Sequence, residues 1–289
     1  MRDFVIATES NADLPAEFVK EHGICVIPHY YTVEEEVYGD GKFLTAKEFY
    51  DAMRAEKPAA TMASNPTVIE EMFTRHMKEG RDILFISFSS ELSAGFNNIV
   101  MTSRVVMEAY PERTIEVVDT RSATLGEMMM ITKAVELRRA GQTLTQTKAV
   151  LEELIPHLCL LFTVDDLNHL YRGGRLSKPA AVVGSLIDVK PILHINAEGK
   201  LVALQKTRGR KKSINTLVSS MEERLGAWRD KQIFIGVMHG DSEEDAEYLK
   251  QQIKEKMGYE NIIVSAIGPS IGAHSGPGAL GLAFLGEYR

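Results

Sequence analysis

Short apolar stretches alternate with longer segments of helical periodicity in the first part of the chain, and this alternation constrains the fold more than any other feature. Four apolar stretches predict buried strands, at residues 4–7, 24–28, 83–87 and 114–118. The segment after the third stretch carries large apolar residues at the spacing of a helix face, from Phe96 to Tyr110. Such alternation predicts a doubly wound, mainly parallel sheet with helices on both faces.

The pattern changes near residue 172. A strand predicted at 158–164 and a short helix at 165–171 end the first half, and two later apolar runs flank the turn sequence NAEG at 196–199, which is typical of an antiparallel hairpin. The remaining pattern predicts helices and strands in alternation, at residues 211–228, 233–237, 243–257 and 262–265. We therefore predict an N-terminal α/β domain at 1–171 and a smaller C-terminal α+β domain with a mixed or antiparallel sheet at 172–289.

Composition excludes several classes of protein. A chain of 289 residues with 44% hydrophobic content can bury a large core, and its net charge of -7 argues against nucleic-acid binding. The two cysteines, Cys25 and Cys159, form no CxxC motif, and the histidines show no metal-binding spacing, so no metal site is expected. The first apolar stretch is too short for a signal peptide, and none reaches transmembrane length, which predicts a cytoplasmic protein.

The loop SSELSAGF at residues 89–96 joins a predicted strand to a predicted helix. Such loops lie at the carboxyl edge of a parallel sheet, where α/β proteins bind their ligands. Ser93 is placed to cap the helix, and the backbone N–H groups near Ala94 and Gly95 could bind an oxyanion. A serine that only caps its helix is the alternative that the residues leave open.

A second candidate site is the sequence IGAHSGPG at residues 271–278. It predicts a glycine-rich turn that carries His274, with backbone N–H groups that could face an anion. The letters GPGALG at 276–281 match a dinucleotide-binding pattern, but too little chain follows for the βαβ unit that this pattern requires. A turn with a purely structural histidine is the alternative.

The basic run RGRKK at residues 208–212 stands out in an acidic chain. Its members Arg208, Arg210 and Lys211 lie at the start of a predicted helix, where cations oppose the helix dipole. A phosphate group or an acidic partner surface would explain them, and a solvated helix start is the alternative. The apolar residues at 180–187 and 192–193 could either wall a tunnel or fill a core.

Eight sequence blocks, taken in order, resemble those of the DegV family, the fatty-acid-binding partners of bacterial fatty acid kinase. TESNADLP at 8–15 resembles the family's TDSTADLP, TMASNP at 61–66 its TSQPSP, and SSELSAGF at 89–96 its SSxLSGTY. The other blocks follow in the same order along almost the whole chain, at residues 118–120, 170–177, 190–193, 208–212 and 272–281.

This resemblance implies a carrier without enzymatic activity or a cofactor, which buries a long-chain fatty acid in an apolar tunnel between two domains. Thr61 and Ser93 would bind the carboxylate, with His274 beside it. Ser64 could replace Thr61 after a small shift of the alignment, and further neighbours of the head group would be Ala94, Gly95 and Gly276.

The resemblance also implies a partner. A fatty acid kinase would phosphorylate the carboxylate of the bound lipid, and the carrier would hold the fatty acid or the acyl phosphate. The residues that would meet the kinase or the phosphate are Arg172, Arg175, Arg208, Arg210 and Lys211. A peripheral contact with membranes would serve lipid exchange.

An enzyme is the alternative function. Ser93 and His274, with Asp13 or Asp119 to orient the imidazole ring, would suit a serine hydrolase or a phosphoryl-transfer enzyme. Ser93 lacks the GxSxG elbow that α/β-hydrolases use, so the sequence favours the carrier.

Overall fold

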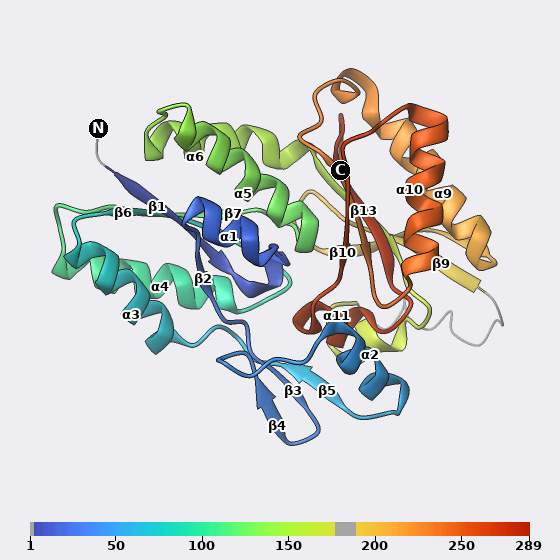
Figure 1. Ribbon diagram of the computed structural model, residues 1–289, viewed down its shortest axis with the longest axis horizontal. Coiled ribbons are helices and arrows are strands. Elements are labelled where there is room, and N and C mark those ends of the chain that lie inside the picture. The colour runs from blue at the N-terminus through green and yellow to red at the C-terminus, as the bar shows by residue number, and fades with distance from the viewer. Residues whose placement is uncertain (1–2, 177–188) are drawn as a thin grey trace.

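The predicted parallel sheet is present in the computed structural model, which describes residues 3–176 and 189–289 (Figure 1). Its strand order is β2-β1-β6-β7 and all neighbouring pairs are parallel, with bounds β1 Phe4–Glu9, β2 Cys25–Ile27, β6 Asp82–Ser87 and β7 Ile115–Asp119. The helices around it are α1 Ala16–His22, α3 Pro66–Lys78, α4 Gly95–Ala109, α5 Thr124–Arg139 and α6 Leu144–Leu154.

Helices cover both faces of this sheet, which explains why its strands are mostly apolar. In β6, Ile83 and Phe85 pack with α3 and α4, whereas Leu84 and Ile86 face the core that contains α5. Figure 1 shows α3 and α4 on one side of the sheet and α5 and α6 on the other.

The second sheet has six strands in the order β10-β9-β8-β13-β11-β12 and is mixed, as predicted. β11 and β12 are parallel, and the other neighbouring pairs are antiparallel. The strand bounds are β8 Leu158–Thr163, β9 Val189–Ile195, β10 Leu201–Arg208, β11 Ile235–His239, β12 Ile262–Ala266 and β13 Leu280–Leu285. One face packs on α9 (Arg210–Leu225) and α10 (Glu243–Met257), and the other face shares a core with α5.

β8 precedes the boundary that we predict at residue 172, yet it belongs to the six-stranded sheet. It pairs with β13 along its whole length, with Leu158 opposite Leu285 and Thr163 opposite Leu280. The six-stranded sheet therefore takes residues from both sides of that boundary. The short helix α7 (Asn168–Arg172) follows β8 and carries the chain toward the interface between the two sheets.

A small third sheet, with the order β4-β3-β5, was not predicted from the sequence. Its strands are β3 Tyr31–Val33, β4 Glu36–Tyr38 and β5 Ala59–Thr61. Each strand has three residues, and none lies in an apolar run as long as residues 24–28, which predicted the equally short β2. This sheet matters for the site because Thr61 is the last residue of β5.

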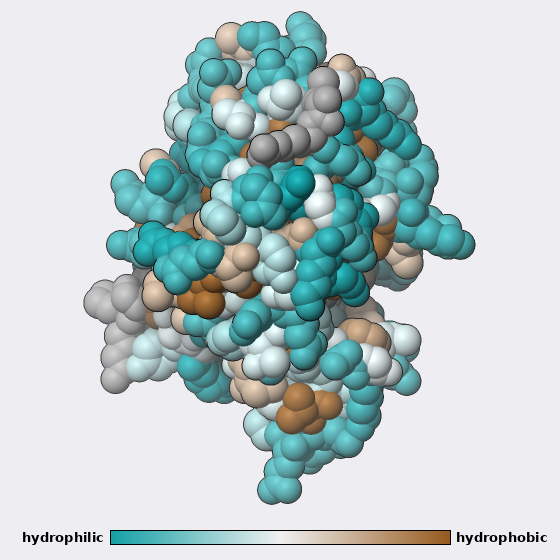
Figure 2. Space-filling view, turned by 90° about the vertical axis from the view of Figure 1, so that its left-hand side faces the viewer, coloured by the Kyte–Doolittle hydropathy of each residue, from teal (hydrophilic) through white to brown (hydrophobic). Residues whose placement is uncertain are grey.

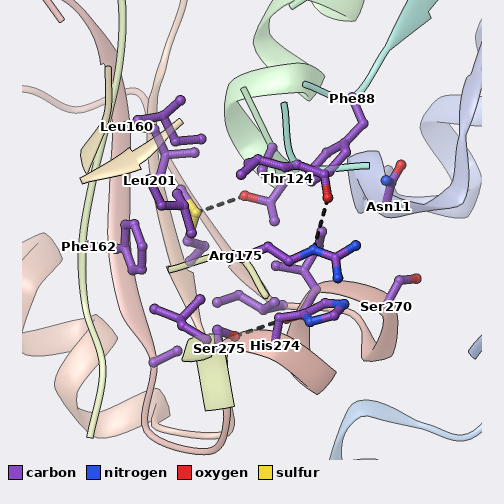
Figure 3. A pocket seen from close by; sticks show the side chains of 18 of the residues that line it. Asn11, Phe88, Thr124, Leu160, Phe162, Arg175, Leu201, Ser270, His274 and Ser275 are labelled. Atoms are coloured by element: carbon purple, nitrogen blue, oxygen red, sulfur yellow. Dashed lines mark hydrogen bonds between the residues drawn. The ribbon is translucent and has the colours of Figure 1, made fainter. Parts of the chain in front are cut away.

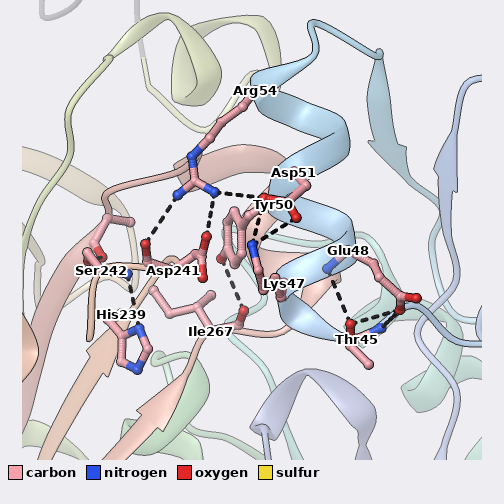
Figure 4. Close-up of polar contacts among 11 residues, drawn as sticks. Thr45, Lys47, Glu48, Tyr50, Asp51, Arg54, His239, Asp241, Ser242 and Ile267 are labelled. Atoms are coloured by element: carbon pink, nitrogen blue, oxygen red, sulfur yellow. Dashed lines mark hydrogen bonds and ion pairs between the residues drawn. The ribbon is translucent and has the colours of Figure 1, made fainter. Parts of the chain in front are cut away.

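Helix α2 (Ala46–Arg54) joins this small sheet to the carboxyl-terminal part of the molecule (Figure 4). The buried Tyr50 hydroxyl donates a hydrogen bond of 3.0 Å to the carbonyl oxygen of Ile267. Arg54 forms an ion pair with Asp241 and also donates to the Asp241 carbonyl oxygen at 3.2 Å. These contacts hold α2 against the segments that follow β11 and β12.

The predicted glycine-rich turn is wrong in its first part, where residues 269–275 form the helix α11 (Pro269–Ser275). Pro269 occupies the first helical turn, where a proline costs no hydrogen bond. Gly272 lets the helix approach α2, since a Cβ atom at this position would lie 2.6 Å from the Tyr50 hydroxyl oxygen. The turn itself begins at Gly276, which has a positive φ of 76°.

Most of the surface seen in Figure 2 is hydrophilic, with small and separate hydrophobic patches. Within the described ranges, we find no helix with the length and apolar character that a membrane crossing requires. The apolar residues predicted at 180–187 to wall a tunnel or fill a core lie outside the described residues. Ile192 and Leu193 are buried in the core.

Candidate functional site

An apolar cavity lies where the loops at the carboxyl edge of the parallel sheet meet the six-stranded sheet. It has about 720 Å³ of empty space, part of it open to solvent. The apolar residues of its wall come from both sheets and their connections and are Phe88, Leu92, Ala123, Leu160, Phe162, Leu170, Ile195, Leu201, Met238, Ile267, Ile271, Ala279 and Leu280. Its polar residues are Asn11, His29, Thr61, Ser93, Thr124, Arg175, Ser270, His274 and Ser275.

Polar side chains gather on one side of this cavity. Figure 3 shows Asn11, Arg175 and Ser270 on the side opposite Leu160 and Phe162. The cavity is therefore amphipathic: the side with Leu160 and Phe162 is apolar, and the other side, its polar end, combines polar side chains with Phe88.

Thr61 and His274 meet at the polar end although 213 positions separate them in the sequence. The Thr61 hydroxyl oxygen lies 2.8 Å from His274 Nε2. Burial lowers the pKa of His274 to about 4, and the positive charge of Arg175 adds to this effect. The imidazole is therefore neutral at physiological pH.

Ser93 also lines the cavity, at the end of the loop that leaves β6. The helix α4 begins one residue later than expected, so Ala94 occupies the N-cap position and has no side chain to cap with. The Ser93 hydroxyl still accepts a hydrogen bond of 3.1 Å from the Gly95 N–H. The hydroxyl hydrogen stays available to a ligand, because this bond uses the oxygen only as an acceptor.

Ser64, unlike Thr61, does not line the cavity. Its hydroxyl donates to the carboxylate of Glu9, to which Ser87 also donates at 3.1 Å. Burial raises the pKa of Glu9, and these hydrogen bonds oppose the rise. A Cβ atom at Gly95 would lie 3.0 Å from the Ser64 hydroxyl, so Gly95 lets α4 begin close to this cluster. Ala94, Gly95 and Gly276 are likewise absent from the cavity wall.

Arg175 places a guanidinium group in the cavity wall. Its Nε donates a hydrogen bond of 3.0 Å to the Leu92 carbonyl oxygen, which fixes the side chain beside the Ser93 loop. An adjoining open cleft is lined by Arg172 together with Thr61, Arg175 and His274. Three of the cavity's polar residues therefore reach the protein surface through this cleft.

Gly173 packs directly against His274. A Cβ atom at Gly173 would lie 2.1 Å from His274 Nδ1, a distance that no side chain can tolerate. This ring nitrogen is buried and has no hydrogen-bond partner within residues 3–176 and 189–289. The imidazole thus presents Nε2 to Thr61 and its opposite edge to the backbone.

The basic run at residues 208–212 lies outside both the cavity and the adjoining cleft. Arg210 forms an ion pair with Asp245, with Nε 2.8 Å from the carboxylate, and Lys211 lies 5.4 Å from the centre of the Tyr248 ring. Arg208 is exposed at the end of β10. Contacts within the protein account for Arg210 and Lys211, and the structure does not bring the run together with Arg172 and Arg175 in one pocket.

The triad required by an enzyme is not assembled in the described part of the chain. Asp13 accepts a hydrogen bond of 3.1 Å from the Gly268 N–H, and Asp119 accepts one of 2.6 Å from the Ser90 hydroxyl. Among residues 3–176 and 189–289, no carboxylate bonds to His274 Nδ1. Without such a partner the imidazole is not oriented to act as a base toward Ser93.

Asn11 and His29 are two of the polar wall residues that sequence reasoning missed, together with Thr124, Ser270 and Ser275. Asn11 lies in a short 3₁₀ helix directly after β1, and His29 follows β2 two residues beyond its end. Both therefore occupy the carboxyl edge of the parallel sheet, and a polar residue in the loop after a predicted strand is the sequence feature that could have identified them. Burial, with a contribution from the charge of Arg175, lowers the pKa of His29 to about 4.

The fold and the cavity define an α/β protein that encloses an amphipathic cavity between its parallel sheet and its six-stranded sheet. The family model described as "Uncharacterised protein, DegV family" matches residues 3–287. A DegV domain-containing protein of Clostridium perfringens is 38% identical over 291 aligned positions, which cover 100% of this chain and 99% of the relative. The chain belongs to the DegV family.

Two solved structures extend this comparison. The fatty-acid-binding DegV family protein from Thermus thermophilus is 28% identical, with a TM-score of 0.86 and coverage of 99% of this chain and 100% of that protein. DegV from Bacillus subtilis, a fatty acid binding protein, is also 28% identical, with a TM-score of 0.85 and the same coverage of both chains.

Proposed function

We propose that this protein binds one long-chain fatty acid, with the acyl chain in the apolar cavity and the carboxylate at its polar end. The observation that carries this proposal is the amphipathic cavity, whose apolar wall also holds Thr61 in contact with His274, and Arg175 bonded to the residue before Ser93. Fatty acid binding by the relatives from Thermus thermophilus and Bacillus subtilis supports the assignment.

The physical chemistry of the cavity suits such a ligand. Burial of the tail contributes about 0.8 kcal/mol for each CH₂ group, so the apolar wall supplies most of the affinity. The guanidinium of Arg175 compensates the charge of a carboxylate, and the hydroxyls of Thr61 and Ser93 can donate charge-assisted hydrogen bonds to it. No metal or cofactor has a part in this binding.

We further propose that the bound carboxylate is presented to a fatty acid kinase and that the protein carries the fatty acid or the acyl phosphate. The open cleft beside Arg172 reaches Thr61, Arg175 and His274, and it could admit a phosphate donor to the head group. The protein itself contributes binding and no chemistry, in keeping with a His274 ring that no carboxylate orients.

Lipid exchange at a membrane surface is part of the same proposal. Phe43 is 65% exposed and Val37 is 50% exposed, and both belong to the segment between β3 and α2. Met62, which is 40% exposed, follows Thr61 directly. These apolar side chains could contact lipid near the cavity without any membrane-spanning segment.

The test is native mass spectrometry of the protein as purified, followed by binding measurements on the delipidated protein. We expect a bound mass that corresponds to a fatty acid. The double variant Thr61→Val with Ser93→Ala should weaken fatty acid binding by about ten-fold or more, because the carboxylate loses two donors.

A matched control is Thr216→Val with Ser219→Ala on the surface of α9. It makes the same chemical changes outside the cavity wall and should leave the affinity unchanged. A protein that neither carries nor takes up fatty acid would contradict the proposed function. Equal affinity in the two double variants would contradict the assigned carboxylate site.

A further inference from the structure

The cavity holds hydrogen-bonding capacity that a simple fatty acid does not use. Both polar atoms of the Asn11 side chain and both ring nitrogens of His29 lack hydrogen-bond partners in the described ranges. Asn11 is 1% exposed and His29 is 6% exposed, and both line the cavity. Unsatisfied buried polar groups are destabilising, so two adjacent cases in one cavity wall point to a ligand group that pairs with them.

The other polar atoms of the cavity differ from this pair. Thr61 and His274 pair with each other, Ser93 accepts from Gly95, and Arg175 donates to Leu92. His274 Nδ1 is also unpaired, but it faces the backbone of Gly173 and is closed to a ligand. Within residues 3–176 and 189–289, Asn11 and His29 are thus the side chains of the cavity wall whose polar atoms are all buried and unpaired.

The kind of group that fits can be derived from these two side chains. The Asn11 amide offers both a donor and an acceptor, and so does a neutral imidazole, which burial favours at His29. A carboxylate only accepts hydrogen bonds and would leave the acceptors of both residues unpaired. A hydroxyl group donates one hydrogen bond and accepts others, so it can donate to one of the two residues and accept from the other, which leaves one acceptor fewer unpaired than a carboxylate does.

The position of the pair indicates where on the ligand this hydroxyl lies. The backbone N–H of His29 donates a hydrogen bond of 2.9 Å to the Ser10 hydroxyl, which holds His29 next to the short helix that carries Asn11. His29 lines the same cavity as Arg175 and His274, two residues of the proposed carboxylate site. Figure 3 shows Asn11 well away from Leu160 and Phe162.

We propose that Asn11 and His29 form a second polar subsite that binds a hydroxyl group close to the carboxylate, so that the preferred ligand is a 2- or 3-hydroxy fatty acid. This inference rests on the proposed function and specifies its ligand class.

The experiment compares ligands that differ by one hydroxyl group. Dissociation constants of the delipidated protein are measured for palmitic, 2-hydroxypalmitic, 3-hydroxypalmitic and 16-hydroxypalmitic acids. We expect one of the acids hydroxylated near the carboxylate to bind about ten-fold more tightly than palmitic acid. The acid hydroxylated at its far end should bind less tightly than palmitic acid, because that hydroxyl would enter the apolar end.

Variants locate the preference in the subsite. Asn11→Leu and His29→Leu should bring the ratio between the dissociation constants for palmitic acid and the hydroxy acid close to one. Thr61→Val should weaken both acids and keep their ratio. The thermal midpoint of the ligand-free Asn11→Leu protein shows that it is folded, and it should rise because a buried unsatisfied amide is removed.

The outcomes are distinguishable. Equal binding of palmitic acid and both acids hydroxylated near the carboxylate would overturn the inference and leave fatty acid binding intact, with solvent alone at Asn11 and His29. A preference that survives both leucine variants would also overturn it. Binding of none of the acids would contradict the proposed function, and the inference with it.

Discussion

At the scale of single residues, the packing of Gly173 on His274 is the most sensitive feature of the site. In Gly173→Ala, the new methyl group would overlap His274 Nδ1, since the Cβ position lies 2.1 Å from it. The ring must move, and it cannot then keep its contact of 2.8 Å with Thr61. We expect fatty acid affinity to fall by about ten-fold or more, as measured by titration of the delipidated protein.

The control for this variant is Gly141→Ala, at a glycine with a positive φ of 81° and open space around it. It should lower stability through backbone strain but leave the affinity unchanged. Normal affinity in Gly173→Ala would show that the position of the imidazole does not matter for binding.

Each site residue that sequence reasoning identified lies in a recognisable sequence block or in a loop after a predicted strand. Thr61, Ser93 and His274 line one cavity, although their roles toward a ligand stay predictions. Asn11 and His29 escaped because a single polar residue after a strand is common, and only burial without a partner distinguishes these two.

At the scale of secondary structure, the contact between α2 and α11 positions His274. In Gly272→Ala, the new Cβ atom would lie 2.6 Å from the Tyr50 hydroxyl oxygen and 2.9 Å from a ring carbon of Phe49. We expect the free energy of unfolding to fall by about 1–3 kcal/mol, the usual cost of overpacking. Urea denaturation of the ligand-free protein measures this loss.

Combining Gly272→Ala with Tyr50→Phe tests the cause. Tyr50→Phe alone loses the hydrogen bond to Ile267, but it also removes the oxygen atom that the new methyl group meets first. The double variant should therefore be more stable than the sum of the two single losses predicts. If the two single losses simply add in the double variant, contact with the Tyr50 hydroxyl is not the cause of the destabilisation.

Elements were predictable from sequence in proportion to their length and burial. The strands of the parallel sheet and the helices α9 and α10 gave clear periodic patterns. The small sheet of β3, β4 and β5 gave none, and the glycines around His274 suggested a turn where α11 is helical. Glycine serves there for close packing against Tyr50 rather than for a turn.

At the scale of the whole molecule, stability should depend on pH through Asp13. Burial raises the pKa of this carboxyl group to about 7, with the Gly268 hydrogen bond opposing the rise, from an ordinary value of 3.8. Between these values the folded protein keeps a proton that the unfolded chain releases. The free energy of unfolding therefore decreases as pH rises through this range, by about 1.4 kcal/mol for each pH unit.

Asp13→Asn isolates this contribution. The amide oxygen can still accept the hydrogen bond from Gly268, and asparagine tolerates the positive φ of 52° at this position. We expect the variant to be more stable than the wild type by a few kcal/mol at pH 8, with a smaller difference at pH 5. Equal differences at both pH values, measured by urea denaturation, would exclude titration of Asp13 as the cause.

The sequence by itself determined the two kinds of sheet and the loop that opens α4, because these depend on local periodicity and on how strands connect. Only the tertiary structure decided which polar residues share a cavity. Thr61 and His274 are 213 positions apart in the sequence, and Gly173 affects the site only because His274 packs on it. The unpaired atoms of Asn11 and His29 are likewise a property of the folded molecule, since burial and the absence of a partner arise only when the two sheets close around the cavity.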